Sequence, residues 1–352
     1  MATLDELGGW PSVLGPLCAR VDLTSAQAGA AMAEILRGDA TPAQIAAFAV
    51  GLRIKGETVE EMAALVTSML EFAEPVPLGA ELASAVIDTC GTGGDRSGTI
   101  NVSTIAAFVA AGAGAKVCKH GNRAASSKAG SADVLEALGV VIDLGPDGVA
   151  ACVAEAGMGF CFAARFHAAL RHSGPVRREL GVPTVFNFLG PLANPARVRR
   201  QVVGVSDPRM AEKVLGVLRA NGAEHALVVY GHDGLDELTT ADTSTVHELR
   251  DGQVRTYVVD PAELDLAPAT RDDLLGGDAA TNAGLARAVL DGAAGPRRDI
   301  VVLNAAAALV VAGISADLGD GLGAARASID SGAAAGVLDA LVRVSGRVAP
   351  PS

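Results

Sequence analysis

The chain has 352 residues, half of them hydrophobic, and its charged residues give a net charge of −12. This length and hydrophobic content exclude disordered and fibrous classes and suffice for one large or two medium domains. The negative charge argues against general nucleic-acid binding, because an acidic surface repels phosphate backbones. The longest apolar stretch, residues 300–314, is interrupted by Asn304 and is too short to span a membrane, so it predicts a buried helix.

The cysteines and the N-terminal segment favour a protein of the reducing cytoplasm. The five cysteines are odd in number and contain no C-x-x-C pair, so they predict neither a disulfide framework nor a zinc site. Residues 1–14 carry Asp5 and Glu6 and have no basic flank before an apolar core, unlike a secretory signal. We therefore expect a cytoplasmic protein that does not enter a membrane.

Consecutive helices are predicted for the first quarter of the chain. Thr24, Thr41 and Thr58 each stand three residues before a Gln or Glu, which is the pattern of a capping box at a helix start. Gly38 and Gly56 are placed to end the first two of these helices. This part of the chain therefore predicts a small all-helical domain.

A linker follows at Pro75-Val76-Pro77, where two prolines remove backbone donors. We place a domain boundary here, between a helical domain of residues 1–75 and a larger domain of residues 76–352. Residues 166–200 are rich in Arg, Pro and Gly, and we expect this segment to pack back near the hinge between the two domains.

Beyond the linker, short apolar strands alternate with helices. The expected strands are residues 85–88, 116–119, 140–144, 158–163 and 226–230, and the expected helices are residues 103–112, 132–138, 147–156 and 211–220. Such alternation requires right-handed crossovers and predicts a mostly parallel sheet with helices on both faces. Asp251-Gly252 predicts one hairpin, and residues 278–344 have a helical pattern. The predicted fold class is therefore α/β, with a small all-helical domain at the N-terminus.

A glycine-rich turn follows the first expected strand. Gly91, Gly93 and Gly94 allow the backbone to bend tightly and to point free N–H groups at an anion, which favours a phosphate site. The turn is not a Walker loop, because no Gly-Lys-Ser/Thr follows, and a plain strand-to-helix connection has the same composition. Asn101 and Ser103, at the start of the next helix, are suited either to ordinary capping or to phosphate and metal contacts.

A dense polar run, residues 119–133, follows the second expected strand. It contains three cations, Lys119, Arg123 and Lys128, in an otherwise acidic protein. Ligands in open α/β sheets bind beyond the carboxyl ends of the strands, so we expect this run and the glycine-rich turn to line one crevice. The concentration of cations and serine hydroxyls favours a multiply charged phosphate ligand over a plain surface loop.

Asp236 and Glu237 form the third candidate, after the strand expected at residues 226–230. An Asp-Glu pair alone is usually solvated surface. Beside a polyphosphate site, however, two carboxylates in a loop suit Mg²⁺, which is commonly held by one or two carboxylates together with phosphate oxygens.

Taken together, these motifs resemble the anthranilate phosphoribosyltransferase family. The matching segments occur in the right order over nearly the whole chain. They are Gly91-Thr92-Gly93-Gly94-Asp95, Asn101-Val102-Ser103-Thr104, Lys119-His120-Gly121-Asn122-Arg123-Ala124, Asp236-Glu237, and residues 176–181, 186–195 and 276–278.

The resemblance implies a Mg²⁺-dependent pentosyltransferase that transfers the 5-phosphoribosyl group of phosphoribosyl pyrophosphate to the amine of anthranilate. Pyrophosphate leaves, and the reaction is the second step of tryptophan biosynthesis from chorismate. The family also implies a homodimer whose partners are these two substrates, with neither nucleic acid nor a membrane.

The resemblance also implies roles for individual residues. Phosphoribosyl pyrophosphate would be bound by Gly91, Thr92, Gly93, Gly94, Asp95, Thr99, Asn101, Ser103, Thr104, Lys119, Ser126, Ser127 and Ser131. Anthranilate would be bound by Gly91, His120, Asn122, His167, Arg177 and Pro191. The ligands of Mg²⁺ would be Ser103, Asp236 and Glu237. No general base is assigned, and catalysis would depend on positioning by Arg177, Asn122 and His120.

Two alternatives remain beside this interpretation. A pyrimidine nucleoside phosphorylase would share the architecture and the glycine-rich turn, but the Lys119-His120-Gly121-Asn122-Arg123 segment and Asp236-Glu237 argue against it. A non-catalytic relative that binds nucleic acid is disfavoured by the net charge of −12.

Overall fold

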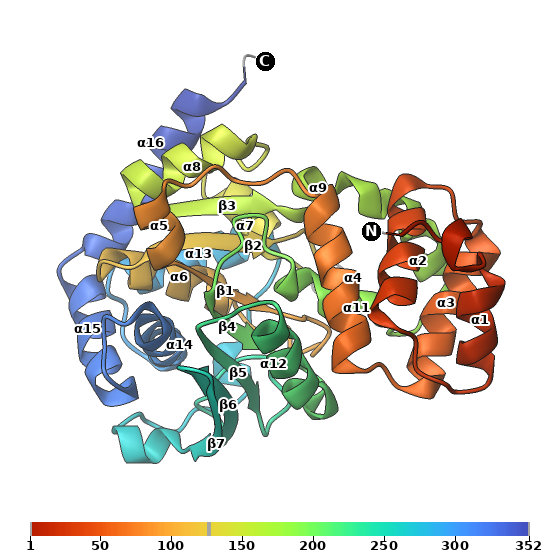
Figure 1. The fold of residues 1–352 in the computed structure, drawn as a ribbon. Helices are drawn as coiled ribbons and strands as arrows, with labels where there is room; N and C mark the ends of the chain where they lie inside the picture. The colour runs from red at the N-terminus through yellow and green to blue at the C-terminus, as the bar shows by residue number, and fades with distance from the viewer. Residues whose placement is uncertain (1, 125–127, 351–352) are drawn as a thin grey trace.

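The computed structural model describes residues 2–124 and 128–350. Figure 1 shows a group of N-terminal helices beside a larger α/β part, which is built around a seven-stranded sheet. The predicted fold class is thereby confirmed. The five cysteines are free thiols, as their spacing predicted.

The N-terminal helices are α1 (Pro11–Cys18), α2 (Ser25–Arg37), α3 (Pro42–Lys55) and α4 (Val59–Phe72). Helices α2, α3 and α4 begin where the sequence predicts, whereas α1 was not among the predicted helices. The threonines before α2, α3 and α4 each accept a hydrogen bond from the backbone N–H three residues on, and the Gln or Glu there accepts one in return, so all three capping boxes form. Helix α2 ends at Gly38, whose φ of 86° is a left-handed conformation that glycine adopts without strain.

One sheet of seven strands forms the centre of the α/β part, in the order β3-β2-β1-β4-β5-β6-β7. The strands are β1 (Val86–Gly91), β2 (Lys116–Gly121), β3 (Met158–Phe162), β4 (Arg200–Gly204), β5 (His225–Gly231), β6 (Ser244–Arg250) and β7 (Gln253–Val259). Strands β1 to β5 pair in parallel, whereas β6 and β7 form the predicted hairpin at the edge. The carboxyl ends of five strands therefore lie at one edge of the sheet, where ligands of such folds bind.

Helices cover both faces of the sheet. Those of the α/β part include α5 (Ala80–Ala85), α6 (Val102–Gly112), α7 (Ser131–Ala137), α8 (Pro146–Ala156), α12 (Ala211–Ala220), α13 (Ala279–Leu290), α14 (Pro296–Ala312), α15 (Leu318–Asp330) and α16 (Ala333–Val348). Val202 of β4 is buried in one apolar cluster with α14, whereas its neighbour Val203 is buried in another with α12, so each face has its own core. The predicted buried helix is confirmed in α14, and no helix of the described residues is both long and apolar enough to cross a membrane.

The core on the α12 face continues into the N-terminal helices. Helix α4 contacts α12 directly. Met62 and Leu65 of α4 and Val214 of α12 are buried in the same apolar cluster as Val228 of the sheet. A continuous apolar core therefore joins the helical part to one face of the sheet.

One of the predicted strands is wrong. Residues 140–144 form no strand in the described part of the chain. Val140 and Leu144 are buried, and the Val141 N–H donates to Ser345 Oγ of α16 at 3.1 Å. The alternation of apolar residues thus arises from packing against helices and not from pairing in the sheet.

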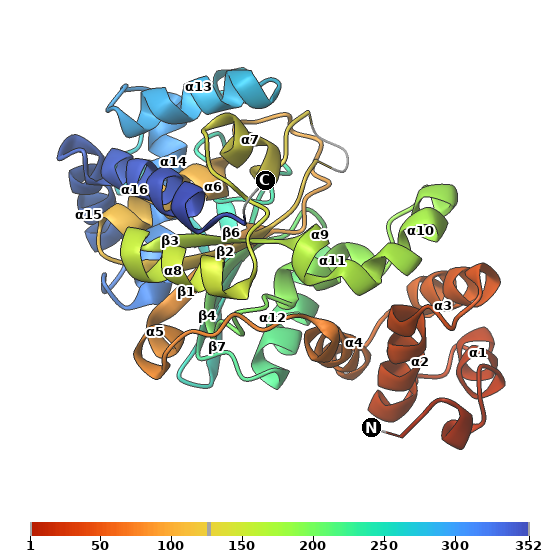
Figure 2. The same ribbon diagram turned by 90° about the horizontal axis from the view of Figure 1, so that it is seen from above.

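A segment of short helices extends from β3 towards the N-terminal helices (Figure 2). It contains α9 (Ala163–Phe166), the 3-10 helix η2 (Ala168–His172), α10 (Gly174–Leu180), α11 (Phe186–Leu189) and the 3-10 helix η3 (Gly190–Leu192). Here η2 contacts α2, α10 contacts α3, and α11 contacts α4. The approach to α2 is close: a Cβ atom at Gly38 would lie 2.7 Å from Cε1 of His172.

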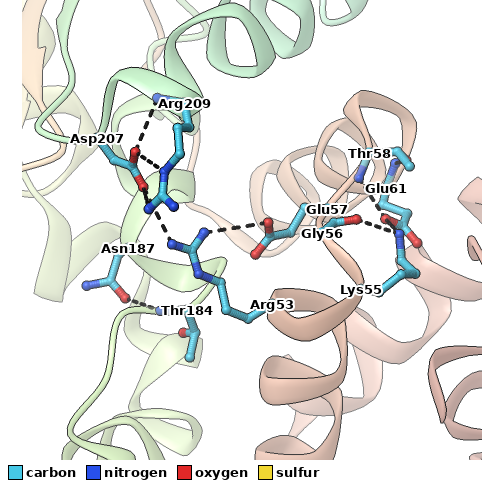
Figure 3. Close-up of polar contacts among 10 residues, drawn as sticks. All are labelled: Arg53, Lys55, Gly56, Glu57, Thr58, Glu61, Thr184, Asn187, Asp207 and Arg209. Carbon is cyan, nitrogen blue, oxygen red and sulfur yellow. Dashed lines mark hydrogen bonds and ion pairs between the residues drawn. The ribbon is translucent and has the colours of Figure 1, made fainter. Parts of the chain in front are cut away.

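Figure 3 shows a second connection between the two parts, which we call the interdomain cluster and define as Arg53, Glu57, Asp207 and Arg209. Arg53 of α3 reaches Asp207 Oδ2 at 3.5 Å and Glu57 Oε2 at 3.8 Å. Arg209 also pairs with Asp207, at 2.8 Å. The Arg53 guanidinium lies 5.9 Å from the ring centroid of Phe188, so it contacts α11 as well.

Candidate active site

The glycine-rich turn leaves the end of β1 and is fixed by the strand next to it. Gly93 and Gly94 have φ angles of 64° and 85°, which explains why glycine occupies both positions. The Thr92 N–H donates to Gly204 O at 2.9 Å, and Thr92 Oγ1 accepts from the Ser206 N–H at 3.2 Å. The turn is therefore bonded to the end of β4 and leads into the N-terminus of α6.

Asn101 joins this turn to the polar run after β2. Its Nδ2 donates to Ala129 O at 3.1 Å, and its Oδ1 accepts from Asn282 Nδ2 at 2.8 Å. In the polar run, Ser131 Oγ donates to Asn122 O at 3.3 Å. The two predicted phosphate-binding segments thus lie side by side at the carboxyl edge of the sheet.

Lys119 is the cation buried between these segments, with 2% of its surface exposed. Its Nζ donates to Thr89 O and lies 3.3 Å from Ser103 Oγ. Below it, the fully buried Asp88 accepts hydrogen bonds from the His120 N–H at 3.1 Å and from Asn194 Nδ2 at 2.8 Å. Burial raises the pKa of Asp88, while the charge of Lys119 acts in the opposite direction.

We call Asp88, Lys119, His120 and Asn194 the buried cluster. Asn194 Nδ2 also donates to Cys118 O at 2.8 Å, so a single amide joins β1, β2 and the segment after η3. Lys119 and His120, near the carboxyl ends of the strands, are consequently surrounded by polar groups that water does not reach.

Two neutral histidines are held by backbone carbonyls of the same segment. His120 Nδ1 is 3.0 Å from Gly190 O, and His167 Nε2 is 2.8 Å from Ala193 O. The rings are 5.1 Å apart and meet edge to face. Burial, followed by His167 and Lys119, lowers the pKa of His120 to about 3. Since Nδ1 must donate to the carbonyl, His120 Nε2 is left as an acceptor, and it has no hydrogen-bond partner among the described residues.

Arg177 lies in α10, within the segment of short helices that follows β3. Its guanidinium lies 5.7 Å from the ring centroid of Phe186 and is half-buried. Among the described residues no carboxylate forms an ion pair with it, and burial lowers its pKa. A half-buried guanidinium without a counter-charge is suited to bind the carboxylate of a ligand.

The two candidate metal ligands face the glycine-rich turn from the connection between β5 and β6. Asp236 Oδ2 accepts from the Gly93 N–H at 2.7 Å, and Glu237 Oε1 accepts from the Ser103 N–H at 3.1 Å. Burial raises the pKa values of both carboxyl groups; nearby Asp95 raises that of Asp236 further, and Asp236 raises that of Glu237.

These donors fit Mg²⁺. Two carboxylates and a hydroxyl are hard oxygen ligands of the kind this ion prefers. No group of three His, Cys, Asp or Glu side chains in the described residues is arranged to hold a metal. One or two carboxylates together with water or phosphate oxygens are the usual ligand set of Mg²⁺, so Asp236 and Glu237 fit a metal that shares its ligands with a bound phosphate.

Comparison with known proteins identifies the family. The sequence model of the glycosyl transferase family helical bundle domain matches residues 11–73, and that of the α/β domain of the same family matches residues 83–335. The chain is 56% identical over 326 residues to an anthranilate phosphoribosyltransferase from Roseiflexus castenholzii, covering 92% of this chain and 95% of the relative. The chain belongs to the anthranilate phosphoribosyltransferase family.

Two solved structures of this family have the same fold. The anthranilate phosphoribosyltransferase of Thermus thermophilus superposes with a TM-score of 0.89 at 40% identity, covering 95% of this chain and 99% of that one. The enzyme of Saccharomyces cerevisiae, in complex with PRPP and Mg, superposes with a TM-score of 0.86 at 26% identity, covering 96% and 98%. The chain is thus an enzyme of the glycosyltransferase class, and neither the phosphorylase nor the nucleic-acid-binding alternative is favoured.

Three of the residues that the sequence assigned to the phosphate site need separate comment. Ser126 and Ser127 lie outside the described residues. Arg123, which the sequence suggested as a phosphate-binding cation, instead pairs with Asp133 at 2.9 Å and with Glu136 at 2.5 Å. The acidic residues of α7 therefore pair with this guanidinium. Lys119, in contrast, donates to Thr89 O of β1 and to Ser103 Oγ of α6, on either side of the glycine-rich turn in sequence.

The structure also reveals supporting residues that sequence reasoning did not assign. Asn194 stands within the family segment 186–195 and Asp88 lies three residues before the glycine-rich turn, but their pairing links positions 106 residues apart. A hydrophilic residue inside a buried strand is the signal that would have singled out Asp88, because an unpaired buried carboxylate is costly.

Proposed function

We propose that this chain catalyses Mg²⁺-dependent transfer of the 5-phosphoribosyl group from phosphoribosyl pyrophosphate to the amine of anthranilate, which releases pyrophosphate. The observation that carries the proposal is the meeting of the glycine-rich turn, Lys119 and the Asp236-Glu237 pair at one edge of the sheet. The family relationship supports the same activity, as does the PRPP and Mg complex of the yeast relative.

Phosphoribosyl pyrophosphate is assigned to the glycine-rich turn and the polar run after β2. The N–H groups at Gly93 and at the start of α6 are suited to its phosphate oxygens, and Lys119 supplies a buried positive charge. The full set proposed for this substrate is Gly91, Thr92, Gly93, Gly94, Asp95, Thr99, Asn101, Ser103, Thr104, Lys119, Ser126, Ser127 and Ser131.

Ser103, Asp236 and Glu237 would hold Mg²⁺, which supplies positive charge to the leaving pyrophosphate. Glu237 is already bonded to the backbone of Ser103, so two of these ligands are adjacent before any ligand arrives. Oxygens of the bound pyrophosphate group would share this metal with the protein, so binding of the metal and of the substrate would favour each other.

Anthranilate is assigned to the region between α10 and the two histidines. The guanidinium of Arg177 would bind the anthranilate carboxylate, and His120, with a neutral imidazole, places no charge beside the aromatic ring. Asn122, His167, Pro191 and Gly91 complete the proposed set.

The chemistry follows from these positions. The bond between the anomeric carbon and pyrophosphate breaks, which leaves positive charge on the sugar and negative charge on the leaving group. Lys119 and the backbone N–H groups stabilise that negative charge as it develops. The amine nitrogen of anthranilate then forms the new bond to the anomeric carbon and releases a proton to the solvent. Positioning by Arg177 replaces activation by a base, because an aromatic amine is already nucleophilic.

We further propose that the chain divides at the linker into residues 1–75 and 76–352, with residues 166–200 placed near the hinge. We also propose that the protein is a homodimer, that it is located in the cytoplasm and that it has no nucleic-acid partners.

Loss of anthranilate fluorescence tests the activity directly. Purified protein is mixed with anthranilate, phosphoribosyl pyrophosphate and Mg²⁺, and each component is omitted in turn. We expect loss of fluorescence only when all three are present. A folded protein that leaves the fluorescence unchanged in the complete mixture would contradict the proposed function.

A further inference from the structure

Asp236 and Glu237, the proposed metal ligands, also accept hydrogen bonds from backbone N–H groups of the proposed phosphate site. Asp236 Oδ2 accepts a hydrogen bond at 2.7 Å from the N–H of Gly93, which lies exposed in the glycine-rich turn. That N–H is one of the backbone groups assigned above to phosphate. A carboxylate of the protein therefore occupies a position suited to an anionic ligand.

Glu237, the next residue, also accepts a hydrogen bond from a backbone N–H of the proposed phosphate site. Its Oε1 accepts from the Ser103 N–H at 3.1 Å, in the first turn of α6. The first N–H groups of a helix have no partner within the helix and attract anions. Lys119 Nζ donates to the hydroxyl of the same Ser103 at 3.3 Å, so three of the proposed phosphate donors already have partners within the chain.

The tight packing of Asp236 shows that this contact is built into the sheet edge. A Cβ atom at Gly91 would lie 2.5 Å from Asp236 Oδ2, and one at Gly204 would overlap the Asp236 carbonyl oxygen. Glycines at the ends of β1 and β4 thus leave the space in which the carboxylate reaches Gly93.

We propose that Asp236 and Glu237 act as internal stand-ins for the pyrophosphate group, and that they make this site select metal-bound over metal-free pyrophosphate. A metal-free pyrophosphate group must displace two carboxylates from their N–H donors and then remain beside their negative charges. When the carboxylate oxygens bind a divalent cation instead, Asp236 and Glu237 lose that repulsion and the N–H groups become available together.

The inference deepens the proposed function and rests on it, since it assigns the same turn to the pyrophosphate group. It goes beyond metal ligation in its prediction for Asp236→Asn. Substitution of a residue that acted only as a metal ligand would weaken binding in Mg²⁺ and leave binding of metal-free pyrophosphate unchanged. Here the substitution must strengthen binding of metal-free pyrophosphate, because it removes a competing anion while keeping the size of the side chain.

The test is calorimetric titration of the full chain with inorganic pyrophosphate, once with EDTA and once with excess Mg²⁺. For Asp236→Asn we expect about tenfold tighter binding than the wild type in EDTA, which corresponds to about 1.4 kcal/mol, and weaker binding than the wild type in Mg²⁺. Asp242→Asn is the matched control: Asp242 is exposed in the same connection between β5 and β6 and bonds to Thr243, so the net charge changes equally without loss of the Gly93 contact. We expect it to match the wild type in both titrations.

Thermal unfolding establishes that each variant is folded, and Glu237→Gln serves as the second variant, with the Ser103 N–H as the donor released. Equal or weaker binding of metal-free pyrophosphate by both folded variants would overturn the inference, even where the wild type binds pyrophosphate well in Mg²⁺. If the wild type failed to bind in Mg²⁺ as well, the assignment of the turn to pyrophosphate would fail instead, and the two failures are thereby distinguishable.

Discussion

The buried cluster and the interdomain cluster are both built from charged and polar side chains, but their surroundings differ. Asp88 and Lys119 are almost completely shielded from water, and Asn194 joins Asp88 to the segment after η3. In the interdomain cluster, the side chain of Arg53 is 30% exposed and that of Arg209 is 80% exposed. Polar groups without access to water depend entirely on their partners, whereas exposed ions can exchange a lost partner for water.

Polar contacts thus have two different functions in the molecule: the buried ones position side chains of the proposed site, and the exposed ones orient the two parts. The buried cluster fixes the positions of Lys119 and His120, which approach the proposed substrates, and it does so at a high cost if it is broken. The interdomain cluster connects α3 to the connection after β4 beside a continuous apolar core, which already holds the parts together. Its contribution should therefore be to orientation more than to stability.

The largest expected effect is that of Asp88→Asn. The substitution removes a carboxylate that interacts electrostatically with the buried Lys119, and it places an amide against the His120 N–H and Asn194 Nδ2, which donated to that carboxylate. We expect the free energy of unfolding to fall by about 3–5 kcal/mol, measured by urea denaturation. Asp39→Asn, at an exposed aspartate, is the control and should change it by less than about 0.5 kcal/mol. A loss at Asp88 no greater than that at Asp39 would remove the distinction between the two clusters.

Glu248 is a second buried carboxylate, and its pKa is shifted in the opposite direction to that of Asp88. Burial opposes its ionisation, but hydrogen bonds from His225 at 3.0 Å and Arg255 at 2.7 Å outweigh burial and lower its pKa from 4.5 to about 2. A lowered folded-state pKa means that this stabilisation is complete above about pH 4.5 and is lost as the pH falls towards 2. We expect ionised Glu248 to contribute roughly 3 kcal/mol at neutral pH.

Urea denaturation of the wild type and Glu248→Gln at pH 6, 4.5 and 3.5 checks this expectation. The wild type should be more stable at pH 6, and the difference should shrink as the solution becomes more acidic. A difference that stays constant over this range would show that the lowered pKa of Glu248 does not contribute to stability.

The smallest effect is expected for Arg53→Ala in the interdomain cluster. Its ion pairs are 3.5 and 3.8 Å long and partly exposed, so their loss should reduce the free energy of unfolding by no more than about 1 kcal/mol. Arg209→Ala, which removes the more exposed cation, should have a still smaller effect in the same urea denaturation. A loss of more than about 2 kcal/mol at Arg53 would mean that the interdomain cluster, and not the apolar core, holds the two parts together.

Local patterns made part of this structure predictable. The capping boxes at Thr24, Thr41 and Thr58 involve residues three apart, and the order of strands and loops indicated which polar segments meet at the sheet edge. Strand β4 escaped prediction because it begins at an arginine and contains two adjacent valines, too few to show a period.

Long-range polar contacts could not be read from such patterns. Asp88 and Asn194 are 106 residues apart, and Arg53 and Asp207 are 154 apart, so only the folded chain brings them together. The ion pairs of Arg123 could not be predicted either. The sequence predicted the helix that carries Asp133 and Glu136, but not that these carboxylates pair with Arg123.

The most direct test of the proposed site compares the two neighbouring arginines of α10 by initial-rate kinetics. Arg177 is half-buried with its guanidinium above Phe186, whereas Arg178 is exposed and serves as the matched control. We predict that Arg177→Ala raises the KM for anthranilate at least about tenfold, as loss of a charge-assisted contact requires, and leaves the KM for phosphoribosyl pyrophosphate nearly unchanged. Arg178→Ala should change neither. Equal increases in both KM values for Arg177→Ala would contradict the assignment of α10 to the anthranilate carboxylate.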